Sequence, residues 1–352
     1  MRNPTPLGYD HFRFPFYLPQ ERQKSALEQA RQLRRASNVI GISLISQQVI
    51  AIVASLAALT IYAAVYLLFL RRPLTSLDPN FLSSSSSPFA LALYCLIYGS
   101  YMFIPFVLIL FIEKRGPLQA VPFRRVREPG LIFPAVAVGL GVSVAGGYLS
   151  DYIQSIFRAI HLQASSPDFT PPSQPASFAL YFFEICLLAP LLEELLFRGA
   201  ILQSLRRFGD GFAIIASALL FGMIHGNLVQ TPFAFLVGLA LGFFVVELGS
   251  IWVSILMHFC INTLSVGLDL LSRYSGLGDA AVNILYLGAV GLLTLAGILI
   301  LVKKRFFHRL KGNYSSPSLP MPYAFKTFCL TPSFLILVLV VAAETSFYLR
   351  IR

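Results

Sequence analysis

The stretch LLEELLFRG (residues 191–199) lies inside an apolar run, 177–202, that is long enough to cross a lipid bilayer. It carries three charged side chains, Glu193, Glu194 and Arg198. On insertion scales each such charge at a helix centre costs about 2.5–3.5 kcal/mol, whereas each Leu, Ile, Phe or Val contributes only about 0.3–0.6 kcal/mol. Three charges therefore cancel most of the apolar contribution of this helix. These side chains must face protein or water, because lipid cannot accommodate them.

The rest of the chain has the same apolar character. Of its 352 residues 56% are hydrophobic and 12% are charged, and soluble domains carry about 25% charged residues. This composition predicts an all-α, polytopic transmembrane helix bundle with about nine membrane helices. The candidate runs lie near residues 39–70, 89–112, 131–149, 177–202, 211–226, 231–247, 250–271, 281–302 and 328–349.

The formal net charge of +11 comes from basic clusters that lie between the apolar runs. They precede the first run and follow the second, fourth and eighth: Arg22, Lys24, Arg31, Arg34, Arg35, Lys114, Arg115, Arg124, Arg125, Arg127, Arg206, Arg207, Lys303, Lys304, Arg305, Arg309 and Lys311. If the helices alternate in direction, all four clusters fall on one side, which the positive-inside rule makes cytoplasmic. Only Arg71 and Arg72 disagree. We therefore expect a multi-pass membrane protein with a cytoplasmic N-terminus, whose basic residues contact the bilayer surface and not a nucleic acid. The membrane is expected to be a bacterial plasma membrane.

Composition also divides the chain into parts. Two polar, proline-punctuated connectors, SSSSSP (83–88) and SSPDFTPPSQP (165–175), are typical of loops or linkers. We predict a basic cytoplasmic N-terminal segment (1–38), front membrane helices and loops (39–176), a helix core with the charged motifs (177–275), and C-terminal membrane helices (276–352).

The three charges of the opening stretch have two interpretations. At 3.6 residues per turn Glu194 and Arg198 lie on one helix face and can pair, whereas Glu193 lies about 100° around the helix without a local partner. One interpretation is structural, with a buried ion pair that holds helices together and Glu193 as a second acceptor. The other is a site whose chemistry uses Glu193. The stretch alone leaves both open.

Two further motifs favour the interpretation as a catalytic site over the structural one. FGMIH (221–225) places His225 near the end of the next helix, and HFCIN (258–262) places His258 and Asn262 one turn apart. A buried core histidine or an interhelical hydrogen-bonded pair would be the structural interpretation of each. Together the three helices carry more polar and charged side chains than helix packing requires. A glutamate can deprotonate a water, one histidine can assist or hold a metal, and the second histidine with the asparagine can stabilise an oxyanion.

Other hydrolase classes are not indicated. The sequence has no GxSxG elbow and no HExxH motif, which argues against serine hydrolases and zincins. GLGD (276–279) has the form of the GxGD motif of intramembrane aspartyl proteases, but the only nearby second carboxylate for Asp279 is Asp269. A turn built by the two glycines explains this stretch better.

The three motifs in this order, EELLFR (193–198), FGMIH and HFCIN, resemble the EExxxR, FxxxH and HxxxN signature of the CPBP family, which comprises CAAX proteases and bacteriocin-processing (Abi) enzymes. The resemblance covers about residues 177–270. It implies an intramembrane, glutamate-dependent endopeptidase with its site between the motif-bearing helices. Carried over by position, Glu193 would activate the water with help from His225. Glu194 and Arg198 would order the site, and His258 and Asn262 would stabilise the oxyanion.

The resemblance leaves cofactor and substrate open. It allows a zinc ion held by His225 and His258, and it equally allows a metal-free site, which we prefer slightly. It implies a membrane-embedded or lipidated peptide or protein as substrate, without naming one. The alternative is a non-catalytic bacteriocin-immunity or scaffold protein of the same fold. A transporter with the same buried charges is less favoured, since no paired half-helix repeats are evident.

Overall fold

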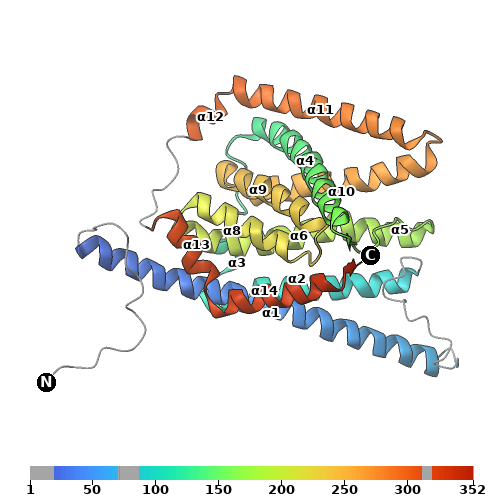
Figure 1. Ribbon diagram of the computed structural model, residues 1–352, viewed down its shortest axis with the longest axis horizontal. Helices are drawn as coiled ribbons and strands as arrows, with labels where there is room; N and C mark the ends of the chain where they lie inside the picture. Colours follow the sequence, from blue (N-terminus) through green and yellow to red (C-terminus); the bar gives the residue numbers. More distant parts are fainter. Residues whose placement is uncertain (1–19, 70, 72–86, 311–318, 352) are drawn as a thin grey trace.

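The computed structural model describes residues 20–69, 71, 87–310 and 319–351, and this part of the chain is almost entirely helical (Figure 1). The predicted all-α membrane bundle is confirmed. The long helices are α1 (Gln20–Leu68), α2 (Pro88–Glu113), α4 (Ile132–Ala159), α9 (Gln230–Leu248), α10 (Ile251–Tyr274) and α11 (Asp279–Lys303). Residues 83–86 of the first predicted linker, with Arg72, Lys311 and the side chains of Arg22, Lys24 and Arg309, lie outside the described residues.

One further rod of helix, which we call the central rod, carries the opening stretch. It consists of α5 (Pro175–Phe182), the π-helical segment η3 (Phe183–Leu188), α6 (Ala189–Glu194), the π-helical segment η4 (Leu195–Ile201), α7 (Leu202–Leu205) and the short 3₁₀ turn η5 (Arg206–Phe208). The shorter helices are α3 (Pro117–Ala120), η2 (Pro129–Leu131), α8 (Asp210–Met223), α12 (Phe306–Arg309), α13 (Met321–Cys329) and α14 (Pro332–Ser346). Two short strands, β1 (Leu162–Ala164) and β2 (Leu349–Ile351), pair antiparallel.

The chain is a multi-pass integral membrane protein. Within the described residues seven helices are long and apolar enough to span a bilayer, and an eighth span is formed if α13 and α14 count as one. Each of the nine predicted runs contains a helix, but two are not simple spans. The helix α8 has 14 residues, about 21 Å at 1.5 Å per residue, which is shorter than the roughly 30 Å hydrocarbon core. The helices α13 and α14 meet at a 70° bend.

Proline explains that bend. Pro332 is the first residue of α14, and Thr331 before it has an extended backbone with φ −77° and ψ 145°. A residue that precedes proline is disfavoured in the helical region because the proline ring contacts its backbone. The helix therefore ends before Thr331 and begins again in a new direction.

The first helix starts nineteen residues before its predicted apolar run. Residues 20–38 are rich in Ala, Leu, Gln, Glu and Arg, which favour helix even where they are too polar for lipid. A buried stripe with alternating steps of three and four residues continues through both parts: Ala26, Ala30, Leu33, Ser37, Ile40 and Leu44. This stripe packs on α2, α13 and α14. The helix boundary here follows propensity and packing, whereas hydropathy marks only the apolar half.

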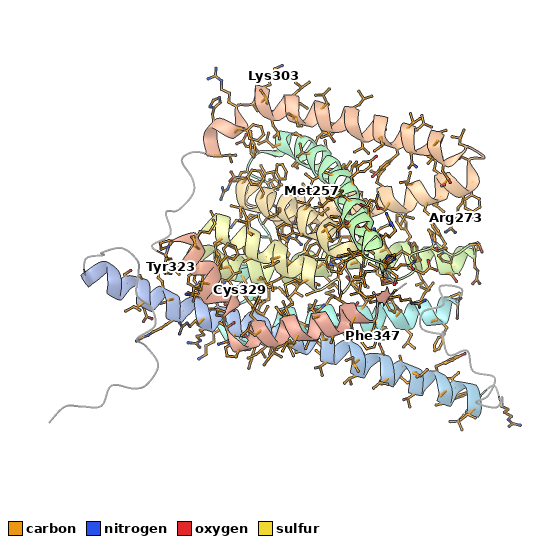
Figure 2. All side chains as sticks on the ribbon, in the orientation of Figure 1. Met257, Arg273, Lys303, Tyr323, Cys329 and Phe347 are labelled. Carbon is orange, nitrogen blue, oxygen red and sulfur yellow. The ribbon has the colours of Figure 1, made fainter. Side chains whose placement is uncertain are left out.

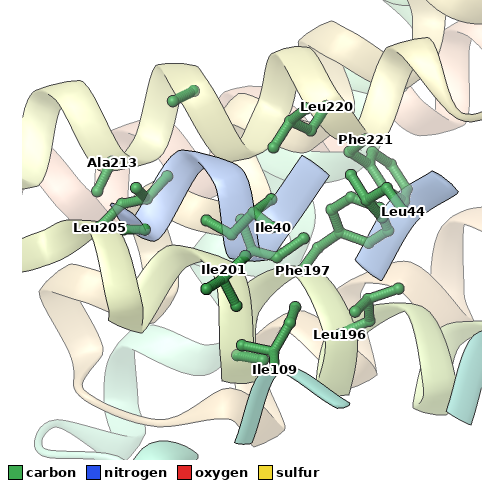
Figure 3. Close-up of a cluster of buried hydrophobic side chains, with 14 of the residues drawn as sticks. Ile40, Leu44, Ile109, Leu196, Phe197, Ile201, Leu205, Ala213, Leu220 and Phe221 are labelled. Atoms are coloured by element: carbon green, nitrogen blue, oxygen red, sulfur yellow. The ribbon is translucent and has the colours of Figure 1, made fainter. Parts of the chain in front are cut away.

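The hydrophobic core lies between the central rod, α1, α2 and α8. Figure 3 shows Ile40 from α1, Ile109 from α2, Phe197 from η4 and Leu220 from α8 in this layer, all of them buried. Because helices on all sides cover η4, its residues from Leu196 to Ile201 are fully enclosed. The core therefore fixes the segment that follows the two glutamates.

Several of the basic clusters meet at one end of the bundle, as the alternation of helices predicts. Arg207 lies 3.9 Å from Glu113, the Ser250 hydroxyl donates to the Arg124 carbonyl at 2.7 Å, and the Lys304 amine donates to the Gly130 carbonyl at 3.2 Å. In Figure 2, Lys303 and Arg273 mark opposite ends of the α10–α11 hairpin. The assignment of the basic end to the cytoplasm stays a prediction.

Candidate active site

The central rod is widened by π-helical turns on both sides of the two glutamates. The Ala189 N–H bonds to the Glu184 carbonyl five residues back. Pro190 has no N–H, so the Ile185 carbonyl lacks the donor that would continue this pattern. The side-chain amide of Asn262 donates to that carbonyl at 2.8 Å. Because of the proline, the Ile185 carbonyl is free to accept from α10, and this bond joins α10 to the rod. Such π-helical turns are often found at functional sites.

Glu194 and Arg198 form the i,i+4 ion pair that helix geometry predicts. The Arg198 Nη1 donates to Glu194 Oε1 at 2.9 Å, and both side chains are completely buried. The second nitrogen, Nη2, donates to the Gly238 carbonyl of α9 at 3.2 Å. The guanidinium carbon lies 4.3 Å from the centre of the Phe221 ring of α8, which is a cation–π contact. Arg198 therefore joins three helices.

His258 contacts both glutamates. Its Nδ1 lies 3.0 Å from Glu194 Oε1, and because a carboxylate only accepts, Nδ1 carries the hydrogen. Its Nε2 lies 3.8 Å from Glu193 Oε2, too far for a hydrogen bond but close enough for attraction when the ring is charged. One oxygen of Glu194 thus accepts from Arg198 and from His258. This shared oxygen fixes the orientation of the imidazole.

His225 lies just after the end of α8. Its Nδ1 is 2.7 Å from the Phe221 carbonyl, one turn back. A carbonyl only accepts hydrogen bonds, so this nitrogen carries the hydrogen, and in the neutral ring Nε2 has the free lone pair. The Phe221 ring packs edge-on against both His225 and His258, with centroids 5.0 Å and 5.9 Å apart. This phenylalanine therefore lies between the two histidines.

The turn after His225 contains a residue that the motif analysis did not single out. Asn227 is fully buried, and its amide donates to the His225 carbonyl at 2.8 Å. Its side-chain oxygen accepts from the Gln230 N–H at 2.8 Å, at the first residue of α9. Gly226 has φ +64° and lies against the Glu344 carboxylate, so a side chain there would be strained and would displace that carboxylate. An asparagine after a glycine between two apolar helices is the sequence signal for such a turn.

Tyr98 of α2 is a second residue that sequence reasoning missed. Its hydroxyl donates to Glu193 Oε1. Glu193 therefore has a hydrogen-bond donor, although it has no arginine partner. The signal was present in YCLIYGSY (94–101), where Tyr94, Tyr98 and Tyr101 recur on one face of an apolar helix.

One polar cavity of about 690 Å³ connects these groups. Glu193, His225, His258 and Asn262 all line it, as the motifs predict. The Phe221 ring of α8 contacts the His258 ring of α10 here. Glu194 and Arg198 do not line it and lie beneath its wall. The connector 165–175, expected to be a plain linker, lines one end of the cavity with residues 166–171.

The GLGD stretch lies away from this cavity. Asp279 is exposed at the start of α11 and accepts from the Ser272 hydroxyl at 2.8 Å. Asp269 pairs with Arg273 at 2.9 Å. Gly276 has φ +70°, as a glycine turn requires. The two aspartates therefore form no catalytic pair.

The donor set does not fit a zinc ion. Among the residues that the structure describes, no three His, Cys, Asp or Glu side chains are grouped so that they could hold one metal. A catalytic zinc normally has three protein ligands. His225 and His258, the two ligands that the resemblance allows, lack a grouped third.

A comparison with family models matches the segment that holds these site residues. Residues 175–264 match the family model described as type II CAAX prenyl endopeptidase Rce1-like. The chain carries an Rce1-like domain. The match begins with α5 and ends inside α10, and so includes every residue of the three motifs and about a quarter of the chain. The CPBP resemblance inferred from the sequence is confirmed. No curated protein and no solved structure matches the chain.

The Rce1-like domain does not contain all the groups that meet at the site. Tyr98 belongs to α2 and Glu344 to α14, both outside residues 175–264. The front and C-terminal helices therefore complete the cavity that the domain begins. This family of intramembrane proteases implies a peptide substrate.

Proposed function

We propose that the protein is an intramembrane endopeptidase that uses Glu193 to activate a water, acting on a membrane-embedded or lipidated peptide. The observation that carries the proposal is the shared cavity, in which three helices present Glu193, His225, His258 and Asn262 to one space. The match to the Rce1-like family supports the reaction class. The cavity of about 690 Å³ supplies room for a peptide segment and for water.

The proposed reaction needs only side chains of this chain. A water in the cavity donates its hydrogens to Glu193 and to the free Nε2 of His225. As its oxygen bonds to the carbonyl carbon of the substrate, its proton moves to Glu193. Glu193 then delivers that proton to the amine nitrogen, and the C–N bond breaks. The products are a carboxylic acid and an amine, so atoms and protons balance.

In this proposal two residues of α10, His258 and Asn262, stabilise the oxyanion. A doubly protonated His258 donates from Nδ1 to Glu194 and from Nε2 to the oxyanion. Asn262 already donates one hydrogen to the Ile185 carbonyl, and its amide nitrogen has a second hydrogen for the oxyanion. Glu194 and Arg198 hold these groups without contacting the substrate. Because the donor set does not fit a metal, no step uses one.

The test of this proposal is the variant Glu193→Gln, which keeps the shape of the side chain and removes its basicity. Membrane peptides from cells with and without the protein identify a substrate, which is then incubated with purified protein. We expect cleavage by the natural protein and a loss of at least about a hundredfold in the variant. Cleavage at the unchanged rate would overturn the proposal. An immunity phenotype that survives the substitution would favour the non-catalytic alternative.

A further inference from the structure

One buried carboxylate of the central rod has no role in the proposed reaction. Glu184 lies on η3, nine residues before Glu193, and it is only 5% exposed. Its side chain lines the cavity and has no hydrogen bond or ion pair within the described part of the chain. A buried carboxylate without a partner costs several kcal/mol unless something compensates it. No side chain that the structure describes does so here.

Three tyrosines line the same cavity as Glu184. They are Tyr94, Tyr98 and Tyr101 of α2, and the rings of Tyr98 and Tyr101 meet edge-on with centroids 5.1 Å apart. The faces of phenol rings attract ammonium and guanidinium groups, and their hydroxyls can accept or donate hydrogen bonds. A carboxylate next to several tyrosines is a chemically suitable environment for an organic cation.

The charge of the whole cavity supports the same ligand. Its lining contains five carboxylates, Asp168, Glu184, Glu193, Asp269 and Glu344, and no Lys or Arg among the residues that the structure describes. Arg273 compensates Asp269 at 2.9 Å. By contrast, Glu344 Oε2 is buried without a hydrogen-bond partner in the described residues. A concave, water-containing site with this excess of negative charge concentrates cations.

We infer that Glu184, with the tyrosines of α2, binds a cationic group of the peptide substrate. This inference rests on the proposed function and names the substrate class more closely. Glu193 lies nine positions after Glu184, which corresponds to at most about 14 Å at 1.5 Å per residue, because the π-helical segment η3 rises less per residue. An extended peptide covers that length with about four residues at roughly 3.3 Å each. The substrate therefore carries a Lys or Arg side chain, or its free terminal amine, about four residues from the bond that is cleaved.

The test measures binding, so that it does not depend on cleavage. It uses the full chain in detergent with Glu193→Gln and a fluorescent apolar peptide of about twelve residues. Lysine is placed at each position in turn, and each peptide is also made with acetyl-lysine, which removes the charge. A second pair with a free or acetylated N-terminus separates the side-chain amine from the terminal amine. We expect about tenfold tighter binding for lysine at one position, or for the free terminus.

Substitutions then assign the preference to Glu184. Adding Glu184→Gln should abolish the tenfold difference, Glu184→Asp should retain part of it, and Asp151→Asn, an exposed acid on α4, should leave it unchanged. Equal binding of charged and acetylated peptides at every position would overturn the inference. So would a preference that Glu184→Gln does not alter. A preference lost with Glu184→Gln supports the inference even if no peptide is cleaved by the natural protein, a result that would contradict only the proposed function.

Discussion

Glu193 and Glu194 are neighbours on the central rod, but they belong to two regions with different contacts and different burial. The ion-pair layer, Glu194 with Arg198, is completely buried, and its charges compensate each other at 2.9 Å. The cavity wall holds Glu193, which lines the cavity and accepts from a tyrosine but has no cation within hydrogen-bond distance among the described residues. The helix turn of about 100° between neighbouring residues produces this separation. Adjacent identical side chains can therefore have a structural role and a chemical role.

His258 connects the two regions. Its Nδ1 contacts the ion-pair layer at 3.0 Å, and its Nε2 faces the cavity wall 3.8 Å from Glu193. A substitution in the ion-pair layer should therefore also lower activity, because it changes the position of the His258 ring. Damage to the cavity wall should leave the packing of the layer unchanged. The variants below test this asymmetry.

The largest effect is expected for Arg198→Ala. It leaves Glu194 charged in a dry interior and removes the bonds to α9 and to the Phe221 ring, so we expect a loss of about 3–5 kcal/mol in the free energy of unfolding. Thermal unfolding and the yield of folded protein measure it. The control is Arg207→Ala, a half-exposed arginine 3.9 Å from its partner, which should change stability by less than about 1 kcal/mol. Equal stability of both variants would show that the pair is not needed for the fold.

A smaller effect is expected for Tyr98→Phe. The substitution removes the hydroxyl that donates to Glu193 and keeps the ring in its packing. The carboxylate then loses the donor that fixes its orientation, so kcat should fall about tenfold, in line with roughly 1.5 kcal/mol for a hydrogen bond to a charged group. Tyr152→Phe, an exposed tyrosine of α4, is the matched control. An unchanged kcat would remove Tyr98 from the site.

Chelation should have no effect at all. Because no described group of three ligands can hold a metal, incubation with a chelator should leave the cleavage rate unchanged. Elemental analysis of the purified protein should show no stoichiometric zinc. Loss of activity that zinc restores, together with loss of the zinc in His258→Ala, would contradict the metal-free mechanism.

The local part of the site is predictable from the sequence. The Glu194–Arg198 pair depends only on helix periodicity, and the motifs identify three helices whose polar residues must avoid lipid. Clustering of Glu193, His225, His258 and Asn262 follows, since buried polar groups gather where water or partners are present. Hydropathy also identifies the seven long helices, but two of its nine runs are a short helix and a bent helix pair.

The remaining part depends on contacts between distant segments. Tyr98 meets Glu193 across 95 positions, and no periodicity in either helix specifies that encounter. Asn262 was interpreted as an oxyanion donor, but its bond to Ile185 exists because Pro190 removes a backbone donor from a π-turn. A π-turn shifts the helix register without a clear sequence signal. The early start of α1 likewise reflects helix propensity and packing, which hydropathy does not measure.

The central claim is that Glu193 and Glu194 have different roles, and the unfolding temperatures of Glu193→Gln and Glu194→Gln, measured side by side in the same detergent, test it without any substrate. Glu194→Gln leaves a buried Arg198 without its counter-charge, so its unfolding temperature should fall by several degrees. Glu193→Gln changes a side chain that lines the cavity, and it keeps an acceptor for the Tyr98 hydroxyl and leaves no cation without its counter-charge, so its unfolding temperature should stay close to that of the natural protein. Equal shifts, or a larger shift for Glu193→Gln, would contradict the division between the ion-pair layer and the cavity wall.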